Sequence, residues 1–155
     1  MANPNPPSKF FDEQVLPPYK AWLDDPATEW KAKATVAAAD NLAERFFKYW
    51  RTLDPSKVVQ ARSVKQFRAA LRAHTPDFGL VWDIHDGNKH WTLDRGNRQV
   101  TSAEQTGYVP SSWDTSAWDT TPWDGAIIIE LDDGSRRNLT DVLANVIAMW
   151  ERLLA

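Results

Sequence analysis

Residues 81–93, which read Val-Trp-Asp-Ile-His-Asp-Gly-Asn-Lys-His-Trp-Thr-Leu, mark a change in the hydrophobic pattern of the chain. Before this stretch apolar residues recur every three or four positions, whereas within it they tend to alternate with polar ones. Alternation is typical of a half-buried β-strand, and Gly87-Asn88 is a favoured two-residue turn. We therefore expect a β-hairpin with Gly87 and Asn88 at its tip.

The chain before residue 79 is expected to be helical. An apolar pattern with the helical period follows Asp25-Pro26 and lasts to about Arg51. Ser63 begins the sequence Ser-Val-Lys-Gln, a capping-box pattern that predicts a second helix start, and this helix should end near His74.

The second half of the chain is expected to form an antiparallel sheet between residues 79 and 139. Residues 126–131 are short and β-branched, residues 132–135 supply a turn, and residues 136–139 return as a strand. Residues 98–102 could add a further strand. Helices first, a sheet next and a helix last predict a single α+β domain over residues 1–155.

The C-terminal segment contains the clearest amphipathic helix, which Asn138 or Thr140 can cap. Its apolar residues cover a wide arc: Val142, Leu143, Val146, Ile147, Met149, Trp150, Leu153 and Leu154. A helix that is apolar over so much of its circumference is often buried on two sides. We therefore expect a homodimer in which a second subunit covers one side.

The composition excludes several classes of protein. The 155 residues contain no cysteine, so disulfides and thiolate nucleophiles are absent, and no stretch is apolar enough to span a membrane. A formal net charge of −3 disfavours nucleic acid as a partner. Residues 1–7 lack the features of a secretory signal and are expected to form a disordered arm. We expect a bacterial cytoplasmic protein.

The chain contains nine tryptophans, and three of them recur in a repeat of Trp-Asp. Trp113, Trp118 and Trp123 are spaced by five residues, which fits neither the helical nor the strand period. Residues 110–124 are therefore expected to form a loop of successive turns. Its rings either anchor the loop on the core or form a binding surface for a partner. Three aspartates and no lysine or arginine disfavour nucleic acid there.

Three polar residues share the second face of the expected hairpin. In this register His85 faces His90, and Asp83 lies on the same side. Imidazole nitrogens and a carboxylate oxygen could hold a divalent metal, and a histidine oriented by Asp83 could act as a general base. The alternative is a solvated polar face whose opposite side packs on the helices.

One further spacing carries a resemblance to a known family. Arg68 and His74 are separated by five residues in an expected helix. Helices with this Arg-x5-His spacing resemble the HEPN-type helical domains, which pair in dimers and include ribonucleases. The resemblance implies a helical dimer that acts on RNA. In this chain Ala69 follows the arginine, where that family usually has a polar residue.

The sequence best fits a binding or interaction protein without catalysis. The alternative is a hydrolase, either metal-assisted or HEPN-like, that acts on RNA or a nucleotide. In the metal-assisted case Asp83, His85 and His90 would hold the metal, which would polarise a phosphoryl oxygen or activate water. No other cofactor is expected.

Overall fold

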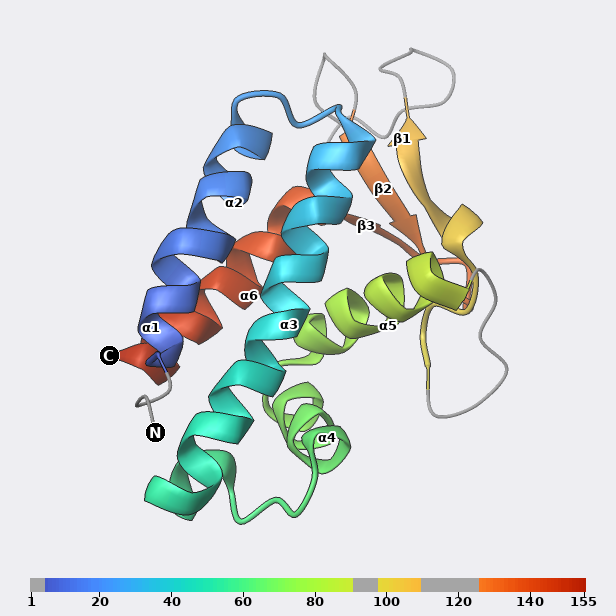
Figure 1. Cartoon of the computed structure of the whole chain (residues 1–155). Coiled ribbons are helices and arrows are strands. Elements are labelled where there is room, and N and C mark those ends of the chain that lie inside the picture. Colours follow the sequence, from blue (N-terminus) through green and yellow to red (C-terminus); the bar gives the residue numbers. More distant parts are fainter. Residues whose placement is uncertain (1–4, 91–97, 110–125) are drawn as a thin grey trace.

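The structure is a computed structural model that describes residues 5–90, 98–109 and 126–155. It is an α+β arrangement, as the sequence predicts: helices form most of the molecule, and a three-stranded antiparallel sheet lies at one end (Figure 1). Among the described residues, no helix combines the length and apolar character needed to cross a membrane.

The first three elements follow one another without a break. They are α1 (Pro7–Phe10), the π-helical turn η1 (Phe11–Val15) and α2 (Leu16–Leu23). Pro17 and Pro18 have no amide hydrogen to donate to the preceding turn, and the π-helical turn lies directly before them. The disordered arm expected for residues 1–7 is wrong at its end, because Pro7 is buried and begins α1.

Polar side chains cap the two helices that follow the long helix α3 (Glu29–Leu53). The first is the short 3₁₀ helix η2 (Pro55–Val58), whose cap Asp54 accepts a hydrogen bond from the Ser56 amide. Helix α4 (Val64–His74) begins at the predicted cap, since Ser63 Oγ accepts from the Gln66 amide at 3.1 Å. The predicted end at His74 is confirmed.

The expected β-hairpin is wrong. Residues 76–90 form one continuous helix, α5 (Pro76–His90), which begins with a proline at its first position. Gly87 lies inside this helix and has no positive φ, so it does not form a turn. It is buried, and a Cβ added there would make an ordinary van der Waals contact with the backbone of Ala103 at 3.6 Å.

The alternating pattern was misleading because α5 is enclosed by other elements. It contacts α3, α4 and α6, and it buries apolar and polar side chains alike. Asp83 and His85 are only 1% and 7% exposed, although the pattern suggested an exposed polar face. A buried helix with internally paired polar groups has no single apolar stripe, so its period is hidden.

The sheet is smaller than expected. It consists of β1 (Thr106–Val109), β2 (Ala126–Glu130) and β3 (Arg136–Asn138), in the order β1-β2-β3. The predicted strands after residue 125 and the turn between them are confirmed. The further strand expected at residues 98–102 does not form, and the short 3₁₀ helix η3 (Ala103–Gln105) leads into β1.

Helix α6 (Leu139–Leu154) closes the domain, and Asn138 caps it by accepting from the Thr140 amide. Both sides of its apolar arc lie inside the chain: Val142, Leu143 and Val146 are fully buried. Trp150 is also buried and donates its ring hydrogen to the Ala39 carbonyl at 3.1 Å. A second subunit is therefore not needed to cover this helix.

We predict that Gly87→Ala stabilises the protein by about 0.5–1 kcal/mol, because alanine is the better residue inside a helix. An added Cβ would meet its nearest atom, the Ala103 nitrogen, at an ordinary 3.6 Å. Urea denaturation measures the change. Gly134→Ala is the control: with φ of +86° in the turn before β3, it should destabilise. Equal destabilisation by both changes would contradict a helical Gly87.

Candidate functional site

A buried carboxylate, Asp83, organises the polar interior. Its Oδ1 accepts hydrogen bonds from Arg72 at 2.5 Å and from Arg98 at 3.3 Å. Its Oδ2 accepts from the backbone amides of Gln99 at 2.9 Å and Val100 at 3.4 Å. Both oxygens are thus occupied by groups from α4 and from the segment that follows α5.

The same two arginines form cation–π contacts with the ring of Trp82. The guanidinium carbon of Arg72 lies 4.6 Å from the centre of the Trp82 ring, and that of Arg98 lies 5.9 Å away. Arg98 also forms an ion pair with Asp86 at 3.1 Å. Cation–π contacts of this kind hold the guanidinium groups over the ring, so these charges are fixed by the fold.

A second buried carboxylate, Asp40 on α3, joins α4 and α5. Its Oδ2 lies 2.6 Å from Nδ1 of His85, and its Oδ1 accepts from Nε of Arg68 at 2.9 Å. A carboxylate on Nδ1 orients an imidazole in the way that general-base histidines are oriented. The arrangement is enclosed, since the His85 side chain is 9% exposed.

Burial raises the pKa of Asp83 above the ordinary aspartate value. The amides of Gln99 and Val100 and the guanidiniums of Arg72 and Arg98 act in the opposite direction and lower the pKa, but burial is the larger effect. The carboxyl group therefore binds its proton more tightly in the folded protein than in the unfolded chain.

The residues predicted from the hairpin are placed differently by α5. Asp83 and His85 are two positions apart on a helix, so they point to different neighbours and do not share a face. The side chain of His90 lies outside the described residues, as do Trp113, Trp118 and Trp123. Among the described side chains, no three His, Asp or Glu residues gather in a group that could hold a metal ion.

The two residues behind the HEPN resemblance also have separate surroundings. Arg68 binds the buried carboxylate of Asp40, where it meets His85. His74 is exposed at the end of α4 and lines a small pocket there. No local pattern indicates that Arg68 and His85 share Asp40, because these three residues lie on three different helices.

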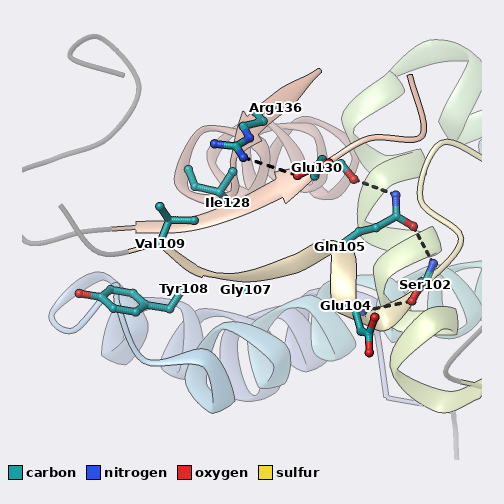
Figure 2. Close-up of a pocket in the computed structure, with 9 residues that line it drawn as sticks. All are labelled: Ser102, Glu104, Gln105, Gly107, Tyr108, Val109, Ile128, Glu130 and Arg136. Carbon is teal, nitrogen blue, oxygen red and sulfur yellow. Dashed lines mark hydrogen bonds and ion pairs between the residues drawn. The ribbon is translucent and has the colours of Figure 1, made fainter. Parts of the chain in front are cut away.

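A pocket of about 350 Å³ lies over the outer face of the sheet (Figure 2). The register pairs Gly107 with Ile128, so these two residues share this face, and Val109 shares it too. Figure 2 shows the side chains of Val109 and Ile128 close together on it. Ile127 and Ile129 point the other way, into the core. The floor of the pocket is therefore apolar.

The rim of this pocket is polar and largely acidic. Glu130 and Arg136 face each other across β2 and β3 at 3.6 Å, and both side chains are more than half exposed. Glu104, on η3, forms no ion pair with any described residue and points away from the core. An exposed pair at this distance contributes little to stability, so its charges are available to a ligand.

One glutamine side chain fixes the rim to the sheet. Gln105 Oε1 accepts from the amides of Thr101 and Ser102, each at 2.8 Å, and its Nε2 donates to the Glu130 carbonyl at 2.8 Å (Figure 2). The sequence Ser102-Ala-Glu-Gln105 is a capping-box pattern, which is the one signal that could have indicated this turn.

Comparison with known proteins finds no matching family model, no matching curated protein and no matching solved structure.

We predict that the stability of the wild type relative to Asp83→Asn falls as the pH rises from about 3 to about 7. Because the pKa of Asp83 is raised, the stability it contributes is present below the unfolded pKa and is lost as the pH rises through the folded pKa. Guanidinium denaturation at a series of pH values measures this difference.

Asp133→Asn is the matched control. Hydrogen bonds from the side chain and amide of Ser135 lower the pKa of Asp133, so the wild type should gain stability relative to this variant as the pH rises. The stability difference between the wild type and Asp83→Asn could instead change with pH in the same direction as that for Asp133→Asn. This result would contradict the prediction, because the ion pairs to Arg72 and Arg98 would then outweigh burial in setting the pKa of Asp83.

Proposed function

We propose that the protein is a cytoplasmic binding protein that recognises another polypeptide at the sheet pocket and catalyses no reaction. One observation carries the proposal. The buried carboxylates between the helices are already paired, Asp83 with Arg72 and Asp40 with Arg68. The sheet pocket, in contrast, presents acidic side chains to solvent over an apolar floor.

The pocket suits an extended segment with a cationic side chain beside an apolar one. Its volume lies at the lower end of the ~300–1,000 Å³ typical of ligand pockets. Val109 and Ile128 would contact the apolar side chain, and Glu104 and Glu130 would bind the cation. Within the described part of the chain Arg136 is held only by an exposed ion pair, so a ligand cation can replace it at Glu130.

The partner is expected to lie over the face of the sheet and not to extend its edge. The outward amide of Tyr108 on the edge strand β1 already donates to Glu29 Oε1 at 2.9 Å. Addition of a strand at this edge needs that amide. Recognition therefore depends on side chains above β1 and β2.

A fluorescein-labelled peptide of alternating valine and lysine tests this proposal by fluorescence anisotropy. We expect the full chain to bind it, and Glu104→Lys to weaken binding on the order of tenfold by replacing attraction with repulsion. Glu151→Lys, an exposed site on α6, is the matched control and should leave binding unchanged. Equal affinities for both variants, or no binding at all, would reject the pocket as the site.

A hydrolase is the second candidate, favoured by the 2.6 Å contact between Asp40 and His85. In this case His85 would act as general base on RNA or a nucleotide, with Arg68 close to the same carboxylate. Cleavage of a labelled RNA that His85→Asn abolishes and the exposed Lys20→Gln retains would support it. Absence of cleavage with folded protein, checked by circular dichroism, would reject it.

The metal-assisted form of this candidate makes a separate prediction. If Asp83, His85 and His90 bind a divalent ion, saturating Zn²⁺ or Mn²⁺ should raise the melting temperature by mass action, and His90→Ala should abolish the rise. The non-catalytic proposal expects an unchanged melting temperature. Thermal melts with and without each metal decide between the two.

The homodimer also remains a proposal, and it has to use a surface other than the arc of α6 that the chain itself buries. Light scattering at micromolar concentration tests it, because a stable dimer cannot return the monomer mass of 17.7 kDa.

A further inference from the structure

The basic residues of the chain are concentrated in one segment. Residues 45–74 contain eight lysines and arginines and a single acidic residue, Asp54. Because the whole chain has a formal net charge of −3, the remainder is strongly acidic. In space this segment comprises the C-terminal part of α3, then η2 and α4, at the opposite end of the molecule from the sheet (Figure 1).

A pocket of about 250 Å³ lies within this basic end, between η2, α4 and the last turns of α6. Its floor is apolar and includes Phe67, Leu71, Met149 and Leu153. Every charged or titratable side chain that lines it is basic: Lys57, His74 and Arg152. We call it the basic pocket.

These basic side chains form no ion pair with a carboxylate of the described residues. His74 and Arg152 form no ion pair within the described ranges, and Nζ of Lys57 lies 4.8 Å above the Trp50 ring. A charge that is not neutralised locally attracts an anionic partner at long range. The rim of the basic pocket therefore favours a carboxylate or another anion.

The backbone at the rim of the basic pocket is strained at two residues. Val59 has φ of 49° and ψ of 37°, in the left-handed region that β-branched residues rarely adopt, and Gln60 follows with φ of 59°. Val59 is 61% exposed beside the pocket, while its neighbour Val58 is fully buried. Residues with such strained backbone angles cluster at binding sites, where the surrounding structure holds them in place. Here the strained turn presents an apolar side chain to solvent.

We propose that the basic pocket binds an acidic polypeptide segment, with one apolar or aromatic side chain inserted against Val59 and Leu153 and a neighbouring carboxylate held by Arg152 and Lys57. The volume is below the usual range for small ligands, roughly 300 Å³ upward, and suits a single anchor side chain. Methionine on the floor adapts to anchors of different shape. This site is independent of the sheet pocket.

A polypeptide fits these observations better than a nucleic acid. Nucleic-acid surfaces stack bases on exposed aromatic rings, but the one aromatic residue in the lining, Phe67, is 2% exposed. A long polyanion would also be repelled by the acidic remainder of the chain. A short acidic segment with an apolar anchor meets only the basic end.

The sequence of the chain itself supplies a probe with this chemistry. A synthetic fluorescein-labelled peptide of residues 111–124 contains three tryptophans, each followed by aspartate. We expect the full chain to bind this peptide in an anisotropy titration. Binding should weaken when salt rises from about 50 mM to about 500 mM. A peptide with asparagine at the three aspartate positions should bind about tenfold more weakly.

Two variants locate the binding. Arg152→Glu should weaken binding of the peptide on the order of tenfold, because it reverses a charge at the rim. Ala70→Leu places a larger side chain in the lining of the basic pocket and should also weaken it, with little cost to a helix. Lys20→Glu, exposed on α2, is the charge-matched control and should have no effect. Circular dichroism checks that each variant is folded.

Three results would overturn the proposal. The first is equal affinity for the aspartate and asparagine peptides, and the second is unchanged binding by folded Arg152→Glu and Ala70→Leu. The third is tighter binding of a labelled oligouridylate that the same two variants weaken, which would assign the basic pocket to RNA. None of these outcomes depends on Glu104 or the sheet pocket, so the two proposals fail separately.

Discussion

The rest of the structure depends on the pairing of one buried carboxylate, Asp83. A carboxylate that is 1% exposed must be matched by hydrogen bonds and opposite charge. Arg72 comes from α4, Arg98 from the segment after α5, and the amides of Gln99 and Val100 from the same segment. These partners come from segments before and after α5, so Asp83 determines how α4 and the approach to the sheet lie against α5. Buried ion pairs of this kind serve specificity of arrangement more than stability.

Other polar residues of α5 are also paired with residues from distant elements. Asp77, near its beginning, accepts two hydrogen bonds from Arg137 of β3 at 2.9 Å and one from Asn145 of α6 at 2.7 Å. His85, further along, meets Asp40 of α3. Each polar residue thus connects α5 to a different neighbour, and the helix acts as the central connector of the domain. Polar groups used in this way are fixed in the interior.

Two of the pockets on the described surface differ in charge and lie at opposite ends of the molecule. The sheet pocket has Glu104 and Glu130 at its rim, whereas the basic pocket has Lys57, His74 and Arg152. The overall charge of −3 averages over this separation and conceals it. A molecule with separated charge orients itself in the field of a partner, and the two proposals assign a different polypeptide to each end.

The sequence by itself determined the elements whose signals are local. The cap at Ser63, the end of α4 at His74, the strands after residue 125 and the amphipathic α6 all follow from neighbouring residues and were predicted correctly. Tertiary structure decided α5. Its alternating pattern predicted a hairpin, because the sequence does not reveal that Asp83 is neutralised by an arginine on another helix. The candidate sites were hidden for the same reason, since both pocket rims and the Asp40–His85 contact join residues that are distant in sequence. Local hydrogen bonds and periodicity can be recognised along the chain, but the pairing of buried charges exists only once the helices have packed.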